Sequence, residues 1–218
     1  MKKTAIFIGI LIVLIVIATF IFNSKIKKED KSSKITMPEN ILEGKKVAMI
    51  MAFKNFRDAE YFVTKETLEK FGVVVTSVST KKGIALGADG GEVEVDLTLE
   101  ELKLADFNGI IFIGGPGALK ELDNENSYNL IRETVSQNKV LGSICISPVI
   151  LAKAGVLKNR KATVWSSPLD RSPIKIFKEN RVKYVPEEVV VDGKIVTGNG
   201  PDAAEEFGIK LVGVLTMK

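Results

Sequence analysis

Three nearly uninterrupted apolar runs constrain the fold of this chain more than any other feature. They cover residues 46–53, 109–115 and 139–144 and lack the polar–apolar alternation of a half-exposed strand. Strands of this kind are buried on both faces, as in parallel sheets whose crossover helices cover either side. The sequence therefore predicts an α/β fold with a mostly parallel sheet.

In the segments between and after these runs, the apolar residues recur either at helical spacing or in patterns typical of further strands. The expected helices are one that starts at Asp58 and ends at Gly72, one over 127–137, one over about 147–154 and one that begins at Pro201. The further expected strands are 73–79, 161–165 and a hairpin over 187–198 that turns at Asp192-Gly193. Strands that alternate with helices in this way indicate a sheet covered on both faces.

The N-terminal part differs in character from the rest. Residues 4–22 carry no charge, and at about 1.5 Å per residue they nearly span a hydrocarbon core of about 30 Å. A cleaved signal peptide is the alternative, but the run is long for one and lacks a clear cleavage site. We expect a membrane anchor at 1–22, a polar linker at 23–43 and one domain at 44–218. The lysines after the apolar run favour a single-pass membrane protein with a cytoplasmic domain.

Two residue counts exclude several classes of site. The chain has one cysteine and no histidine, so no disulfide within the chain, no Ser-His-Asp or Cys-His catalysis and no histidine-based zinc site can form. The net charge of +4 is small, and no basic stripe interleaved with aromatic residues marks the folded part. We expect no nucleic-acid partner, no metal and no organic cofactor.

Cys145 is the strongest candidate for a reactive residue. It follows a buried strand and precedes a helix, as in a nucleophile elbow, where a tight turn presents the side chain above the sheet. The N-terminus of the next helix favours a thiolate, so the sequence predicts an unusually acidic thiol. The alternative is a buried, inert cysteine.

Two further features can lie near this cysteine. A glycine-rich turn, Gly114-Gly115-Pro116-Gly117, ends another strand and can bring a backbone N–H beside Cys145. Glu60 lies in the first turn of the helix after the first strand, where a solvated acid favoured by the helix dipole is the alternative.

These segments resemble the DJ-1/PfpI superfamily over the whole chain from about Lys45. The resemblance is carried by FRDAEYF at 56–62, IIFIGGPGA at 110–118, SICISPVILAKAGVLKNRKAT at 143–163 and VVVDGKIVTGNGPDAAEEFG at 189–208. It implies a flavodoxin-like, doubly wound sheet and a homodimer or larger homo-oligomer. It also implies that Cys145 is the functional centre, that Glu60 hydrogen-bonds its sulfur, and that the backbone at Gly114, Gly115 and Ile146 forms an anion site.

The cysteine segment departs from part of the family. Protease-like members have histidine directly after the cysteine, whereas Ile146 stands here, so the elbow is nearer to the Cys-Ala-Gly-Pro form of the DJ-1 branch. Ser147 replaces the usual glycine, which requires a negative φ or some strain at that residue. The region where that branch often has a further histidine reads Trp165-Ser166-Ser167-Pro168, and a serine hydroxyl cannot serve as a base near neutral pH.

Four functions are compatible with these residues. The first is a cofactor-independent enzyme of the glyoxalase or deglycase type, in which Cys145 adds to a small carbonyl substrate. In this mechanism Glu60 would shuttle the proton, and the N–H groups of Gly115 and Ile146 would hold the oxyanion. The second is a redox sensor or stress-response protein without turnover, in which Cys145 is oxidised to a sulfinate. An intracellular peptidase of the PfpI type ranks lower because histidine is missing. A tethered interaction module without catalysis ranks last.

Overall fold

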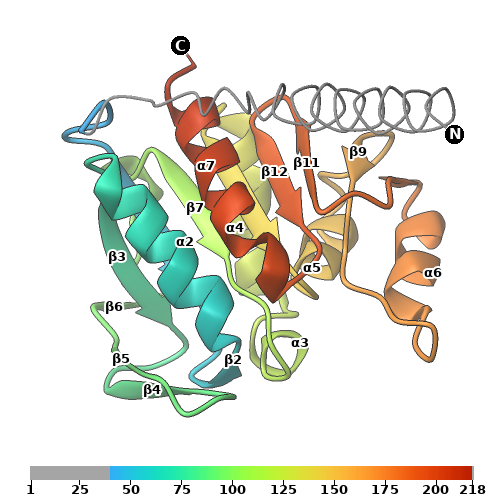
Figure 1. Cartoon of the computed structure of the whole chain (residues 1–218), viewed down its shortest axis with the longest axis horizontal. Helices are drawn as coiled ribbons and strands as arrows, with labels where there is room; N and C mark the ends of the chain where they lie inside the picture. Colours follow the sequence, from blue (N-terminus) through green and yellow to red (C-terminus); the bar gives the residue numbers. More distant parts are fainter. Residues whose placement is uncertain (1–39, 218) are drawn as a thin grey trace, which may run out of the picture. The chain divides into compact units, whose positions relative to one another are not determined.

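The structure is a computed structural model that describes residues 40–217. Its main sheet has seven strands in the order β11-β12-β8-β7-β1-β3-β6 (Figure 1). In chain order these strands are β1 (Lys46–Ile50), β3 (Val74–Ser79), β6 (Leu97–Thr98), β7 (Gly109–Phe112), β8 (Val140–Ile144), β11 (Val189–Asp192) and β12 (Ile195–Gly198). All neighbours are parallel except β11 and β12, which form the predicted hairpin. The mostly parallel sheet is confirmed.

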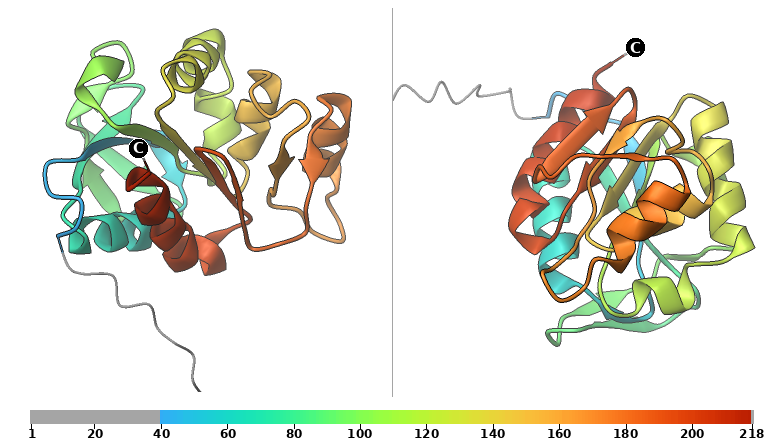
Figure 2. Two further views of the ribbon diagram at one scale, coloured as in Figure 1. Left: turned by 90° about the horizontal axis from the view of Figure 1, so that it is seen from above. Right: turned by 90° about the vertical axis from the view of Figure 1, so that its right-hand side faces the viewer.

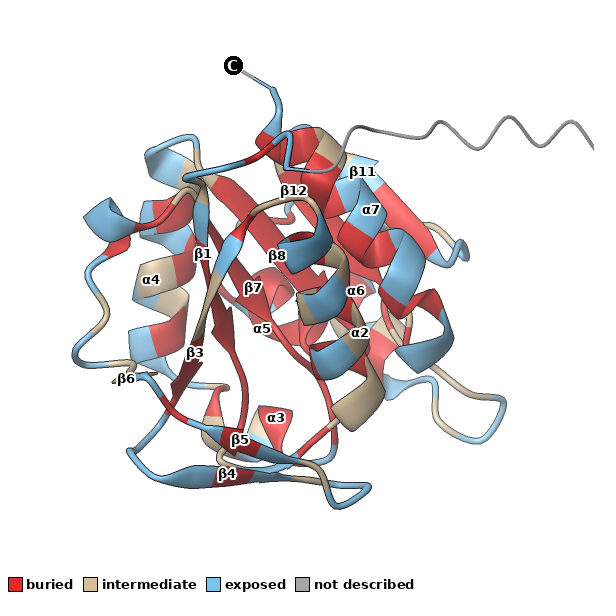
Figure 3. Ribbon diagram, turned by 60° about the vertical axis from the view of Figure 1, so that its left-hand side comes forward, coloured by how far each residue is buried: buried red, intermediate tan, exposed pale blue. Residues whose placement is uncertain are grey.

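Helices cover both faces of this sheet. They are α2 (Asp58–Lys70), α3 (Ala118–Glu121), α4 (Glu125–Ser136), α5 (Pro148–Lys153), α6 (Ser172–Glu179) and α7 (Ala204–Leu215). Figure 2 shows α2 and α7 on one face and α4 and α5 on the other. The central strands are accordingly buried on both sides, and residues 47–50 of β1 have no exposed surface (Figure 3). This burial explains why these strands read as continuous apolar runs.

The strand order by itself indicates at which edge of the sheet a ligand would bind. The five longer parallel strands, β3-β1-β7-β8-β12, follow the flavodoxin-like order 2-1-3-4-5. The chain leaves β1 for β3 on one side and later returns to β7 on the other side, so the direction of winding switches between β1 and β7. Pairing of Ile50 with Phe112, and of Phe112 with Ser143, brings the carboxyl ends of β1, β7 and β8 to one edge. Ligands of open α/β sheets bind at this edge.

Smaller elements flank the main sheet, and several were not expected. A three-stranded sheet contains β2 (Lys54–Phe56), β4 (Ile84–Gly87) and β5 (Glu92–Glu94). A two-stranded sheet pairs β9 (Lys161–Ala162) with β10 (Lys183–Tyr184), so the strand expected over 161–165 is shorter and lies outside the main sheet. Strands this short bury too few residues to leave a periodic signal in the sequence.

The expected fold class also included one transmembrane helix, and this part is corrected. Within residues 40–217 the longest helix is α2, with 13 residues. At about 1.5 Å per residue it is roughly 20 Å long, too short for a hydrocarbon core of about 30 Å. Nowhere in this range is a helix both long and apolar enough to cross a bilayer.

The single-pass membrane location and the membrane as a partner are corrected on the same finding. Both rested on residues 1–22, which lie outside the described residues. The domain boundaries at 1–22, 23–43 and 44–218 stay predictions.

Gly117 generates a prediction about the turn that carries the site. An added Cβ at Gly117 would overlap the carbonyl oxygen of Lys54, a backbone atom with little room to move. Gly117→Ala should therefore lower the free energy of unfolding by roughly 1–3 kcal/mol. The measurement is urea denaturation followed by circular dichroism.

Gly213→Ala is the matched control. Gly213 lies within α7, and an added Cβ there meets nothing within 4 Å. This variant should be neutral or up to about 1 kcal/mol more stable, because alanine favours a helix. Equal losses in both variants would contradict the close approach at Gly117.

Candidate active site

Cys145 lies directly after β8, in the turn that leads into α5. Its φ is 65°, a left-handed conformation that costs an L-residue roughly 1–2 kcal/mol. The turn is held from both sides, because the Cys145 N–H donates to Gly198 O (2.9 Å) and the Trp165 N–H donates to Cys145 O (2.8 Å). The strand–turn–helix expected at this cysteine is present, and its side chain is only 8% exposed.

Ser147 stabilises the turn in a way that the sequence did not reveal. Its φ is −65°, so serine in place of glycine causes no backbone strain. Its buried hydroxyl donates a hydrogen bond to Ile113 O (2.8 Å), just beyond the end of β7. Ser147 thus ties the start of α5 to the neighbouring strand.

Glu60 is a buried acid and not the solvated acid of the alternative reading. It lies in the first turn of α2 and has 0% exposed surface. Its Oε2 accepts a hydrogen bond from the Gly114 N–H (3.0 Å), while Oε1 has no partner among the described residues. Burial raises the pKa of Glu60 to about 7, against the opposing effects of Cys145, the Gly114 N–H and Arg57. Because Oε1 is buried without a hydrogen-bond partner, the protonated form of the Glu60 carboxyl is favoured further.

Cys145 and Glu60 influence each other, and the result differs from the expected acidic thiol. Burial raises the pKa of Cys145 most, and the charge and hydrogen bonding of Glu60 raise it further. The N–H groups of Gly115 and Ile146 act in the opposite direction, since they hydrogen-bond the sulfur and favour the thiolate. Two acidic groups in one buried site cannot both ionise easily. Near neutral pH the pair therefore keeps a proton, and the larger rise in the pKa of the thiol favours sulfur as its site.

The glycine turn after β7 is needed because three segments meet there. A Cβ on Gly114 would lie 2.6 Å from Cys145 Cβ and 2.7 Å from Glu60 Oε2. Gly115 has a φ of 111°, and a Cβ there would lie 2.5 Å from the backbone nitrogen of Arg57. Side chains at these positions would separate the thiol from the carboxyl. The structure thus brings together Cys145, Glu60 and the three predicted backbone positions.

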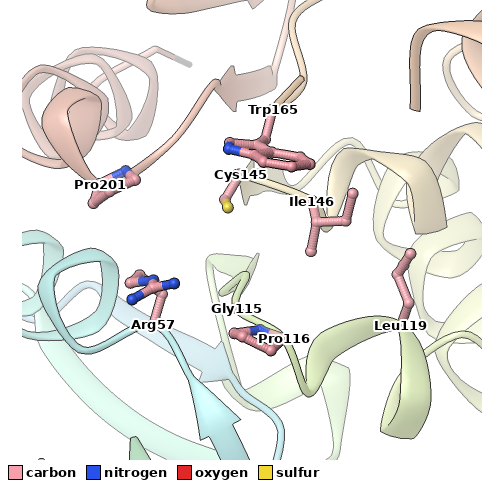
Figure 4. Close-up of a pocket in the computed structure, with 8 residues that line it drawn as sticks. All are labelled: Arg57, Gly115, Pro116, Leu119, Cys145, Ile146, Trp165 and Pro201. Carbon is pink, nitrogen blue, oxygen red and sulfur yellow. The ribbon is translucent and has the colours of Figure 1, made fainter. Parts of the chain in front are cut away.

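A pocket of about 310 Å³ opens over Cys145 (Figure 4). Its lining is mostly apolar and consists of Arg57, Gly115, Pro116, Leu119, Cys145, Ile146, Trp165 and Pro201. The sequence analysis did not single out Arg57. Its position three residues before Glu60 was the available signal, because residues at that spacing lie on the same side of a helix. It also passed over Trp165 in favour of its neighbours. Ser167 is used in a turn with Asp170, and neither Ser166 nor Ser167 lines the pocket.

Within residues 40–217, no cluster of three or more acidic or cysteine side chains is arranged to hold a metal ion. Two titratable residues, Arg57 and Cys145, line the pocket, and the buried Glu60 lies next to Cys145. This set can supply a nucleophile, one transferable proton and one fixed positive charge.

Comparison with known proteins places the chain in a family. The model of the DJ-1/PfpI family matches residues 45–213. An uncharacterised protein of Methanocaldococcus jannaschii is 36% identical over 97% of this chain and 96% of its own length. Deglycase PfpI of Pyrococcus furiosus is 31% identical over 70% of this chain and 89% of its own length.

A solved structure gives the same result. The ThiJ/PfpI domain protein of Brachyspira murdochii superposes with a TM-score of 0.74 at 31% identity, over 79% of this chain and 98% of that one. With a family match that spans nearly all of the described residues and a cysteine elbow at the edge of a flavodoxin-like sheet, this chain belongs to the DJ-1/PfpI family.

Proposed function

We propose that the protein converts small reactive carbonyl compounds by a glyoxalase- or deglycase-like hydration, with Cys145 as the nucleophile. The observation that carries this proposal is the Cys145 thiol next to the buried carboxyl of Glu60 at the base of a small, mostly apolar pocket. The deglycase name of the Pyrococcus furiosus relative supports the same substrate class.

The first step is addition of sulfur to the aldehyde carbon of an α-oxoaldehyde. A C–S bond forms, the C=O π bond breaks, and the thiol proton of Cys145 moves by way of Glu60 to the carbonyl oxygen, which leaves Glu60 as a carboxylate. The product is a hemithioacetal. Negative charge that develops on the oxygen is best stabilised by fixed N–H donors, and those of Gly115 and Ile146 are the nearest candidates.

The second step moves hydrogen between the two carbons of the substrate. The Glu60 carboxylate takes the proton from the former aldehyde carbon while the neighbouring ketone oxygen is protonated, which gives an enediol. Glu60 then returns its proton to the former ketone carbon, and the hydroxyl on the sulfur-bearing carbon loses its proton to replace the one taken up by the ketone oxygen. The result is a thioester of a 2-hydroxy acid. Water then hydrolyses the thioester and frees the Cys145 thiol. One carbon is oxidised and its neighbour is reduced, so the sum is oxoaldehyde plus water to 2-hydroxy acid, with no external oxidant. A carboxyl with a pKa near 7 suits both directions of proton transfer.

The peptidase alternative lacks a group that the reaction needs. An amide leaving group must be protonated as the C–N bond breaks, usually by the base that activated the nucleophile. The chain has no histidine for this purpose. A redox role remains the second candidate, because the N–H groups at the sulfur can also stabilise a sulfinate.

The first test removes the proton of Glu60 and keeps its shape. Glu60→Gln should lower kcat for methylglyoxal by roughly 100-fold or more, the usual scale of general acid–base catalysis. Iodoacetamide should still alkylate Cys145, because the substitution removes the carboxylate charge that raises the pKa of the thiol. Lactate formation measures turnover, and Cys145→Ala should abolish it.

Glu66→Gln is the control, since Glu66 is exposed on the same helix. Parent-like turnover in Glu60→Gln would show that Glu60 carries no proton in the reaction. If the parent forms no lactate in a Cys145-dependent way, yet mild peroxide yields a stable sulfinate at Cys145, the redox role is correct and the carbonyl chemistry is wrong.

The second test concerns stability against pH. Glu60 has a pKa of about 7 in the folded chain and an ordinary value of 4.5, so the folded state holds more protons between these pH values. Stability should therefore fall as pH rises from 4.5 to 7, by up to about 3 kcal/mol from this one group.

Cys145→Ser should be compared with the Cys145→Ser, Glu60→Gln double variant, so that the thiol does not titrate. The serine variant should lose stability relative to the double variant as pH rises, as measured by urea denaturation at pH 4.5, 6 and 8. Parallel curves would mean that Glu60 titrates alike in the folded and unfolded chains.

A further inference from the structure

We infer that the pocket selects α-oxoaldehydes whose tail carries a carboxylate, and that Arg57 binds that carboxylate. This inference rests on the proposed carbonyl chemistry at Cys145 and names the substrate class within it. Arg57 has no part in the mechanism above, yet its side chain lines the pocket together with Cys145 (Figure 4).

The backbone holds Arg57 firmly beside the reactive pair. Its N–H donates to Gly114 O (3.0 Å), and its C=O accepts from the Tyr61 N–H (3.2 Å). The Gly114 N–H in turn donates to Glu60 Oε2. Arg57 is therefore fixed to the same residue, Gly114, that positions the carboxyl of Glu60.

The guanidinium is oriented at one end and has donors left over. Its Nη1 donates to both carboxylate oxygens of Asp89, at 3.1 and 3.0 Å. Among the described residues, Nε and Nη2 of Arg57 have no hydrogen-bond partner. A carboxylate accepts two parallel N–H groups from arginine in the favourable fork geometry. The ion pair with Asp89 thus orients the group and leaves a second edge for a ligand.

Charge in the pocket favours an anion at this position. Arg57 is the one residue with a permanent full charge among the eight that line the pocket, and the others are mostly apolar. Its side chain is 31% exposed, whereas that of Asp89 is 57% exposed, so water screens Asp89 more. The pKa of Arg57 is raised mainly by the bond to Asp89, and also by the charges of Glu60 and Cys145.

The rest of the pocket fits the remainder of such a molecule. The apolar side chains of Leu119, Ile146 and Trp165 surround the space above the sulfur. A volume of about 310 Å³ is at the lower end for ligand sites, which suits a short carbon chain. An oxoaldehyde with a carboxylate tail would place its aldehyde at Cys145, its methylenes against these side chains and its anion at Arg57.

The test uses one substrate with and without its charge, namely 4,5-dioxopentanoate and its methyl ester. By the reaction proposed above, each takes up one water and becomes the matching 2-hydroxy acid. The parent should prefer the acid in kcat/KM. Arg57→Gln should lower kcat/KM for the acid by roughly 10- to 100-fold and leave the ester within about twofold, since a charged hydrogen-bonded pair is lost only with the acid. The change should lie in KM, because the tail is bound equally before and during reaction.

Two further variants separate recognition from folding. Arg57→Lys keeps the charge without the fork and should retain part of the preference for the acid. Arg160→Gln removes a comparable ion pair, with Asp192, outside the pocket and should leave the preference unchanged. Circular dichroism of each variant checks the fold.

The outcomes distinguish this inference from the function on which it rests. Equal kcat/KM for acid and ester in the parent, or equal losses for both substrates in Arg57→Gln, would overturn the role of Arg57 while Cys145-dependent turnover still supported the carbonyl chemistry. If neither dioxopentanoate substrate nor methylglyoxal gives Cys145-dependent turnover, the proposed function fails and this inference fails with it.

Discussion

The hydrogen bond from the Gly114 N–H to Glu60 Oε2 is the contact on which the rest of the site depends. It joins the first turn of α2 to the end of β7, at the edge where the sheet changes its direction of winding. Because Gly114 has no side chain, the carboxyl can lie beside Cys145, out of contact with water. Burial then raises the pKa of Glu60 into the neutral range. A structural bond between a helix and a strand thereby determines the acid–base behaviour of the site.

The strained turn at Cys145 is stabilised by its neighbours. A positive φ at a non-glycine residue persists only where surrounding contacts determine the backbone more strongly than local preference does. Here the peptide units on both sides of Cys145 bond to Gly198 and Trp165, and Ser147 bonds to Ile113. These partners come from three separate chain segments. The position of the thiol is therefore a property of the whole sheet edge and not of the short elbow sequence.

The sequence predicted those features that leave a local pattern. The apolar runs of β1, β7 and β8 and the glycine turn were sufficient to place Cys145 and Gly114 at one edge, whereas the resemblance to a known family was needed to place Glu60 beside them. The pKa of the thiol was not predictable in this way, because it depends on burial and on the charge of a residue far away in the chain. Arg57 was missed for a similar reason, since only the folded turn at Gly115 shows that the start of α2 lies against the pocket. The role of Ser147 likewise depends on a partner on another strand.

The absence of histidine concentrates the chemistry of the site in one short segment. Without an imidazole, the proton of the proposed reaction and the positive charge of the pocket must come from other side chains, and both Glu60 and Arg57 lie at the start of α2. This start is itself tied to the outer three-stranded sheet, because the carboxylate of Asp58 accepts the N–H groups of Asp89 and Gly91 while Arg57 pairs with Asp89. Any movement of the loop between β4 and β5 would therefore shift the cation and the acid together, relative to a thiol held on a different strand. The three-stranded sheet, to which the sequence analysis assigned no function, therefore helps to hold Arg57 and Glu60 in position at the pocket.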